Sequence, residues 1–214
     1  MTELYWNTIS HAMKEIKAEF GRSDLAEKFY LAGGTALALQ LGHRQSIDLD
    51  FFTQNEDISI SRQQVEVSLP LFHPLLVDSS WGNFIFLINS IRVGFFTYGY
   101  PLIAPLIDTN GIQLASLADI GLMKMDALLR RASRKDFHDL YAICQIIPLQ
   151  DLLILAPQRY PGIRDFEAKI IRHLVFFERA DLEAPIPLLQ QVSWEEVKDF
   201  FRQQGNIISK SWIK

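Results

Sequence analysis

The sequence predicts an α+β protein, in which a mixed sheet with flanking helices forms the first half and helices form the second half. Two observations support this prediction. Short β-rich runs, one of them with strict apolar and acidic alternation, recur between 47 and 98. From 116 onward, apolar residues recur at helical spacing behind serines that have an acid three positions later. We therefore expect an α/β core over 1–112 and a helical region packed on it over 113–214.

Each half divides into elements that are separated by turn residues such as glycine, proline, asparagine and serine. In the first half the patterns predict helices over 4–20, 35–41 and 61–69, and strands over 29–32, 47–52, 75–77, 83–88 and 91–98. In the second half they predict helices over 116–131, 133–147, 166–177 and 193–201.

Composition excludes some classes of function. A formal net charge of −4 and a pI near 5.7 argue against a general nucleic-acid binder, which needs a broad basic surface. The chain has one cysteine, Cys144, so it forms no internal disulfide, and its apolar neighbours suggest that it is buried. The N-terminal residues show no signal-peptide core, and glycine and proline interrupt the longest uncharged run, 93–107. We expect a cytoplasmic protein without a membrane segment.

A pair of acidic residues is the first candidate for a metal site. Asp48 and Asp50 are two apart in a predicted strand, so both carboxylates project from one face at a separation of roughly 6 to 7 Å. Like charges at this spacing repel by about 2 to 3 kcal/mol, and a cation would relieve the repulsion. Mg²⁺ suits such a pair because it prefers carboxylate oxygens and leaves room for phosphates. The alternative is the solvent face of a half-buried strand.

A glycine turn precedes this pair. Gly33 and Gly34 stand between a strand and a helix, where glycine lets the backbone approach a ligand and the first helical amides form an anion site. Thr35 adds a hydroxyl as a helix cap or a phosphate donor. Alone, the motif is more often a tight turn with a threonine cap. Together, the turn supplies a phosphate site and the acidic pair supplies a metal site, which is the combination that metal-assisted phosphoryl transfer requires.

The loop before the acidic strand adds two polar candidates for nucleotide binding. Arg44 could pair with a phosphate or with one of the aspartates, and Ser46 could order the loop. The alternative is a polar surface connection.

At this point the sequence resembles a known family. The stretch Leu31–Phe52, LAGGTALALQLGHRQSIDLDFF, is similar to the signature of the AbiEii/AbiGii toxin family, which belongs to the polymerase β-like nucleotidyltransferase superfamily. A second stretch, Leu117–Tyr141, is similar to the downstream lysine and aspartate motif of that family. These stretches and the β-rich segment between them cover most of residues 28 to 147.

The resemblance implies a reaction, partners and site residues. The expected reaction moves a nucleoside monophosphate from a nucleoside triphosphate to an acceptor hydroxyl. Members of the family act as toxins paired with an antitoxin, and some modify tRNA, so both are implied as partners. The resemblance assigns the triphosphate to Gly33, Gly34 and Thr35, magnesium to Asp48 and Asp50, a phosphate contact to Lys124, and completion of the polar site to Asp136.

The residues themselves leave alternatives open in the second motif. Lys124 lies on a mostly apolar helical stripe with Leu117, Ile120 and Arg131, so it needs an anionic partner or must reach past the stripe to solvent. The distance of Asp136 from Ser133 is already explained by a capping box.

One departure from the family pattern concerns catalysis. The superfamily commonly places a third carboxylate on a later strand, and the stretch 91–97 has none. Asp78, Asp108, Asp136 or Asp139 could substitute. Two rival functions follow: a module that binds a nucleotide or a partner without turnover, and an enzyme that modifies a small molecule, whose cationic acceptor would suit the negative net charge.

Overall fold

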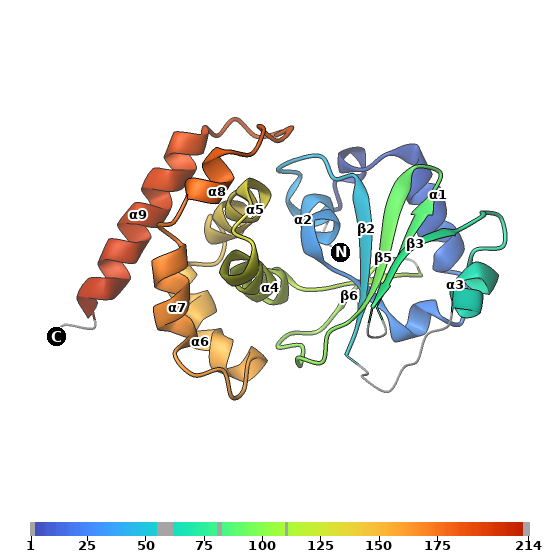
Figure 1. The fold of residues 1–214 in the computed structure, drawn as a ribbon, viewed down its shortest axis with the longest axis horizontal. Coiled ribbons are helices and arrows are strands. Elements are labelled where there is room, and N and C mark those ends of the chain that lie inside the picture. The colour runs from blue at the N-terminus through green and yellow to red at the C-terminus, as the bar shows by residue number, and fades with distance from the viewer. Residues whose placement is uncertain (1–2, 55–61, 81–82, 110, 212–214) are drawn as a thin grey trace. The chain divides into compact units, whose positions relative to one another are not determined.

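The computed structural model describes residues 3–54, 62–80, 83–109 and 111–211 (Figure 1). The chain divides into two compact units. The first comprises residues 1–101 and 105–116, and the second comprises 102–104 and 117–214. Each unit is described by itself below.

The first unit is built on one sheet. Its strand order is β3-β4-β5-β2-β1-β7-β6, in which β2 is parallel to β5 and β1 is parallel to β7, whereas the other neighbours are antiparallel. This arrangement confirms the predicted mixed sheet. The strands are β1 (Tyr30–Leu31), β2 (Asp48–Thr53), β3 (Leu75–Ser80), β4 (Asn83–Ile88), β5 (Ile91–Thr97), β6 (Ile107–Asp108) and β7 (Gln113–Leu114).

The helices of this unit flank the sheet, with α1 and α2 on opposite sides of it (Figure 1). The predicted helix over 4–20 begins only at His11, because Ser10 is extended and its hydroxyl accepts a hydrogen bond from the Met13 amide at 3.2 Å. The helical elements are η1 (Trp6–Thr8), α1 (His11–Phe20), η2 (Ala26–Lys28), α2 (Gly33–Leu41) and α3 (Arg62–Ser68), where η denotes a 3₁₀ helix.

Aromatic packing fills the face of the sheet toward α1. The side chains of β2 alternate between half-buried and buried, as the sequence pattern predicts. On the buried face the Phe51 ring lies 4.6 Å from that of Phe20 in α1, and Phe95 from β5 lies 5.3 Å from Phe51. The alternation in β2 therefore fixes which face of the sheet is core.

Three features of the sheet differ from the sequence expectations. β3 continues through Ser80 instead of ending at Val77. The two-residue strands β6 and β7 were not predicted. Because β7 pairs with β1, residues 113–116 lie with the sheet and not with the helices.

The second unit is helical throughout its described elements. The expected helix over 166–177 ends earlier, at His173, and a separate helix that was not predicted begins at Glu178. The expected helix over 193–201 runs from Trp194 to Ser211. The unpredicted α6 includes Pro157, which reads as a helix breaker in sequence. The elements are α4 (Leu117–Arg130), α5 (Arg134–Cys144), α6 (Leu149–Arg159), α7 (Phe166–His173), α8 (Glu178–Asp181) and α9 (Trp194–Ser211).

The start of α9 confirms one predicted capping box. The Ser193 hydroxyl accepts a hydrogen bond from the Glu196 amide at 3.2 Å, and the Glu196 carboxylate accepts one from the Ser193 amide at 2.7 Å. The local pattern of serine followed by glutamate therefore specified this helix start.

A fully buried ion pair anchors the connection between strands and helices. Asp119 of α4 and Arg159 of α6 both have side chains without solvent exposure, and their Oδ1 and Nη1 atoms are 2.6 Å apart. The same carboxylate accepts hydrogen bonds from the amides of Ile103 at 2.9 Å and Ala104 at 3.3 Å. These contacts hold residues 102–104 in the helical unit.

No individual helix within the described ranges has the length and apolar composition needed to cross a membrane. α5 and α6 meet that test only as a pair, and they are bent by 108° at the break between them. Cys144, at the end of α5, is half-buried, and desolvation raises the pKa of its thiol to about 12.

Replacing Asp119 with alanine should strongly destabilise the helical unit. The substitution leaves the Arg159 charge buried without its carboxylate, which typically costs about 3 to 5 kcal/mol. Urea denaturation followed by circular dichroism measures the change. Asp199→Ala removes an exposed carboxylate from its pair with Arg202 and should change the free energy of unfolding by less than about 1 kcal/mol. Equal effects of the two variants would contradict this account of Asp119.

Candidate functional site

The two predicted acidic residues lie on the same face of β2. Asp48 and Asp50 are half-buried, whereas Leu49 and Phe51 between and beside them have no solvent exposure. The Asp48 carboxylate makes no hydrogen bond or ion pair with any residue that the structure describes. This face therefore presents one carboxylate that is available to a ligand.

The start of α2 lies beside this pair. Gly33 and Gly34 are the first two residues of the helix and do not form a separate turn before it, and Ala32 is the N-cap. Gly33 has a φ of +66°, a conformation that favours glycine. A Cβ added to Gly33 would lie 3.6 Å from Oδ2 of Asp50, so the Asp50 carboxylate reaches the first residue of the helix.

Arg44 lies at the same helix start. A Cβ added to Gly34 would overlap the Arg44 guanidinium, so the absence of a side chain at Gly34 gives the arginine its place. Arg44 is only 8% exposed, and its Nη1 atom donates a hydrogen bond to the Gln45 carbonyl at 2.9 Å. The alternative in which Arg44 belongs to a polar surface connection does not fit this burial.

Thr35 and Ser46 connect the helix to the strand. The Thr35 hydroxyl donates to the Asp48 carbonyl, and its oxygen lies 2.8 Å from the Ser46 hydroxyl oxygen. Both side chains are buried. Thr35 is therefore not the helix cap that the sequence suggested, and the two hydroxyls hold α2 in position against β2.

The structure adds a residue that sequence reasoning missed. Arg92 of β5 stands opposite Asp48 in the parallel pairing of β2 and β5. Its Nη1 atom is 3.0 Å from Oδ1 of Asp50. The available signal was that Arg92 lies in the stretch where the superfamily commonly places a third carboxylate. The local sequence does not indicate which strand pairs with β2.

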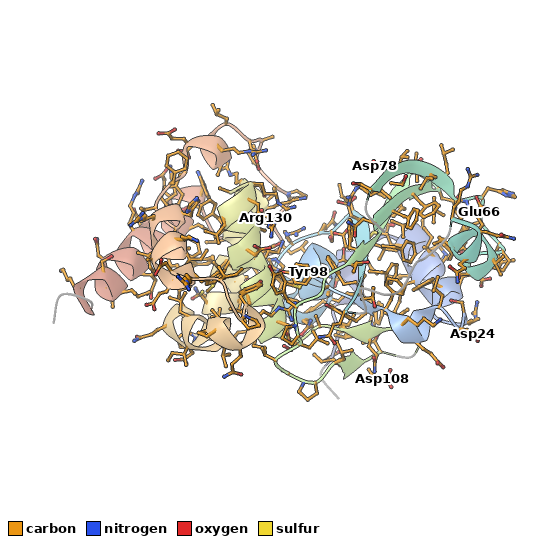
Figure 2. All side chains as sticks on the ribbon, turned by 60° about the horizontal axis from the view of Figure 1, so that its bottom comes forward. Asp24, Glu66, Asp78, Tyr98, Asp108 and Arg130 are labelled. Atoms are coloured by element: carbon orange, nitrogen blue, oxygen red, sulfur yellow. The ribbon has the colours of Figure 1, made fainter. Side chains whose placement is uncertain are left out.

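The substitutes considered for the third carboxylate lie elsewhere. Asp78 is on β3 and Asp108 is on β6, the two strands at opposite ends of the sheet order, whereas β2 is near its middle (Figure 2). Asp136 and Asp139 belong to the helical unit. Over the described ranges no group of three acidic, histidine or cysteine side chains is arranged to hold a metal ion.

The donor set of Asp48 and Asp50 still suits one kind of metal. Mg²⁺ is commonly bound by one or two carboxylates together with substrate phosphates and water, so two carboxylates at a helix start fit a Mg²⁺ that arrives with a phosphate ligand. They do not fit a cation held by protein ligands alone.

Lys124 and Asp136, the other two candidates, contact each other within the helical unit. The Lys124 ammonium lies 3.2 Å from Oδ1 of Asp136 and 2.6 Å from Oδ2 of Asp139. Lys124 is 4% exposed, so the alternative in which its amine reaches past the apolar stripe to solvent is wrong. The expectation that Lys124 needs an anionic partner is confirmed, because two carboxylates contact its ammonium.

Asp136 forms part of a charged network and not the predicted capping box. Arg131 donates to it at 2.7 and 2.9 Å, and Ser133 donates its hydroxyl to it at 2.6 Å instead of capping an amide. Burial alone would raise the pKa of Asp136, but Lys124, Arg131 and Ser133 outweigh it and lower the pKa to about 2.

Two consecutive arginines at the end of α4 pair with neighbouring carboxyl groups. Arg130, labelled in Figure 2, bonds to Asp126 at 3.0 Å, and Arg131 bonds to Asp136 as described. The Arg134 amide donates to the Glu183 carboxylate at 2.8 Å. The guanidinium charges of Arg130 and Arg131 are therefore paired with carboxylates, whereas Arg134 contacts the Glu183 carboxylate through its backbone amide.

Comparison with known proteins identifies related sequences. A family model described as "Nucleotidyl transferase AbiEii toxin, Type IV TA system" matches residues 16–72, which include the glycine helix start and the acidic pair. An uncharacterized protein of Aquifex aeolicus is 38% identical over 188 residues, which cover 84% of this chain and 87% of that protein.

Two solved structures share the fold. MenT4, a nucleotidyltransferase toxin from Mycobacterium tuberculosis H37Rv, is similar with a TM-score of 0.58 and 16% identity, over 89% of this chain and 80% of MenT4. ANT(2")-Ia in complex with adenylyl-2"-tobramycin is similar with a TM-score of 0.53 and 13% identity, over 75% of this chain and 99% of that one. They confirm the predicted nucleotidyltransferase fold.

The Asp136 network should make the helical unit sensitive to acid. Because the pKa of Asp136 in the folded chain lies below the ordinary aspartate value of 3.8, its stabilising contribution is complete above about pH 4 and is lost as the pH falls toward 2. That contribution is about 2 kcal/mol at neutral pH.

Denaturation of the native chain and an Asp136→Asn variant between pH 2 and 7 measures this contribution. The variant should be less stable at neutral pH, and the difference between the two chains should shrink as the pH falls below 4. Asp151→Asn, which changes an exposed aspartate of α6, is the matched control. A difference that stays constant with pH would contradict the assigned role of Asp136.

Proposed function

We propose, because the chain belongs to the AbiEii nucleotidyltransferase toxin family, that it transfers a nucleoside monophosphate from a nucleoside triphosphate to an acceptor hydroxyl at the start of α2. One observation carries the placement of the site: the Asp50 carboxylate and the Arg44 guanidinium both reach the glycines that begin this helix. An acidic side chain that can bind a cation thus lies beside helix-start amides that can bind an anion.

Each candidate site residue of the first unit has a proposed role. The amides at Gly33 and Gly34 bind the triphosphate, because unpaired N–H groups and the helix dipole favour an anion there. Arg44 adds a fixed positive charge beside them. Thr35 and Ser46, whose hydroxyls contact each other, keep the helix start aligned with β2 and are positioning residues.

Asp48 and Asp50 would hold Mg²⁺ together with the phosphates. Bound there, the ion would offset the negative charge that develops on the phosphates during transfer. In the reaction the acceptor oxygen forms a bond to the α-phosphorus, the bond from this phosphorus to the bridging oxygen breaks, and pyrophosphate leaves with the electron pair. The hydroxyl proton passes to water.

The expected phosphate contact of Lys124 stays a prediction, as does the part of Asp136 in the polar site. The structure specifies what such a contact requires. A phosphate would have to compete with Asp136 and Asp139 for the Lys124 ammonium, since both carboxylates already bind it.

The family description supports a protein partner. It names a toxin of a toxin–antitoxin system, so we propose a cognate antitoxin as a protein partner of this chain. For the acceptor we propose RNA, with tRNA as the first species to test, in the cytoplasm.

A labelling assay tests the reaction. Purified protein is incubated with Mg²⁺, each α-labelled nucleoside triphosphate and total cellular RNA. Label should enter RNA with the native chain, and an Asp48→Asn/Asp50→Asn variant should be slower by about a thousandfold, because it lacks the ligands that hold the charge-neutralising ion.

A charge-matched double variant provides the control. Asp24→Asn/Asp78→Asn removes two exposed aspartates of the same unit (Figure 2) and should label RNA at the native rate. If magnesium-dependent nucleotide binding survives in Asp48→Asn/Asp50→Asn, the assignment of the metal site is wrong.

Gly34→Ala tests the helix start separately from the metal. The added methyl group would force the Arg44 guanidinium out of its place, so the affinity for a nucleoside triphosphate should fall by about tenfold, a typical value for a lost charge-assisted hydrogen bond. Isothermal titration calorimetry measures this affinity. Gly205→Ala in α9 is the control, and unchanged binding by Gly34→Ala would remove Arg44 from the site.

A small-molecule acceptor is the second candidate. It is favoured by the shared fold with ANT(2")-Ia, whose structure contains adenylyl-2"-tobramycin, and by the net charge of −4, which suits a cationic acceptor. In the same assay, label on an aminoglycoside and none on RNA would select this candidate.

The third candidate is a module that binds nucleotide without turnover. It is favoured because the described residues bring no third carboxylate to the acidic pair. Triphosphate binding without labelled product on any acceptor would select it.

A further inference from the structure

Arg92 introduces a positive charge on the carboxylate face of the sheet. In the parallel pairing of β2 and β5, Arg92 is the partner of Asp48, and Gly94 is the partner of Asp50. Residues two apart in a strand share a face, so Arg92 and Gly94 lie on the same face as the acidic pair. The guanidinium bonds to Oδ1 of Asp50 at 3.0 Å.

Gly94 stands opposite Asp50 and has no side chain, which leaves room for the Asp50 carboxylate on this face. A Cβ added to Gly94 would lie 3.1 Å from Oδ1 of Asp50 and would overlap the ring of Phe96. The space beside Asp50 is therefore filled by the Asp50 carboxylate and by Phe96. The Arg92 guanidinium lies 5.9 Å from the centroid of that ring.

The pair is placed where a ligand can reach it. The side chains of Arg92 and Asp50 are 40% and 27% exposed, so the guanidinium is neither buried nor fixed on all sides. A cation that binds Asp50 must compete with Arg92. A triphosphate offers the guanidinium a stronger, multiply charged partner and so releases the carboxylate.

We infer that Arg92 is a triphosphate-binding residue that restrains Asp50 from binding a divalent cation until the nucleotide is present. The inference rests on the proposed function and adds a condition to it: cation and nucleotide bind interdependently. By thermodynamic linkage, the factor by which the triphosphate strengthens cation binding equals the factor by which the cation strengthens triphosphate binding. Arg92 supplies part of this coupling.

Two titrations of an Arg92→Gln variant test the inference. Mn²⁺ replaces Mg²⁺ because free Mn²⁺ is counted directly by electron paramagnetic resonance. Without nucleotide, the variant should bind Mn²⁺ about fivefold more tightly than the native chain, since a half-exposed ion pair no longer competes. The nucleotide probes are the α,β-methylene analogues of the four nucleoside triphosphates, which cannot transfer their nucleoside monophosphate. With Mn²⁺ present, the variant should bind these analogues about tenfold more weakly than the native chain, as measured by calorimetry.

The opposite directions of the two effects separate this role from a structural one, because a misfolded site would weaken both ligands. Arg92→Lys keeps the charge and should lie between the native chain and Arg92→Gln in both titrations. Arg22→Gln removes an exposed arginine that pairs with Glu19 in the same unit and should match the native chain.

Mn²⁺ binding by Arg92→Gln that is unchanged or weaker would overturn the inference, and so would unchanged binding of the analogues. In both cases, nucleotide binding by the native chain would leave the proposed function standing. A native chain that binds none of the four analogues would instead overturn the proposed function, and the inference with it.

Discussion

The register of β2 is the constraint on which the candidate site depends. Leu49, Phe51 and Thr53 are buried, and the aromatic core around Phe51 leaves no place for a carboxylate on that face. A shift of one residue would turn both aspartates into the core and expose the phenylalanine. Because burial of the apolar face holds this register, the carboxylates stay side by side at the surface despite their repulsion. The chemistry of the site is thus supported by packing on the opposite face.

The helical unit differs from the sheet unit because it pairs buried cations with carboxylates. It buries Lys124 and Arg159 and provides each cation with at least one carboxylate, from Asp136 and Asp139 in the first case and from Asp119 in the second. Removing water from these groups is costly, and the ion pairs offset the cost only when the geometry is good. Such pairs fix specific side chains of different helices to one another, whereas apolar contacts alone tolerate sliding.

Local patterns in the sequence predicted the features that depend on local physics. Alternation is visible in Asp48–Thr53, and a serine followed by Glu196 marks the start of α9. The two-residue strands β6 and β7 are too short to have a period, so only pairing with distant strands creates them. α6 was not predicted from the sequence, and it contains Pro157, which lacks the amide for a helical hydrogen bond.

The candidate site shows the same division between local and distant signals. The acidic pair and the glycines all lie between Gly33 and Asp50, and local patterns identified them. Arg92 reaches Asp50 from 42 positions away, and Arg159 reaches Asp119 from 40 positions away. Local spacing does not encode these partners, because strand order and helix packing choose them. The sequence thus indicated that Lys124 needs an anion but did not identify Asp139 as that partner.

The Asp119 carboxylate also limits how this protein can be divided. It binds the amides of Ile103 and Ala104, so a short piece of a connection within the sheet unit is incorporated into the helical unit. The backbone consequently passes between the units three times, and neither unit is a continuous stretch of sequence. A gene fragment that ends near residue 116 would separate those amides from their acceptor. A single recombination event near residue 116 would therefore exchange neither unit whole and would break the contacts of Asp119 with Ile103 and Ala104.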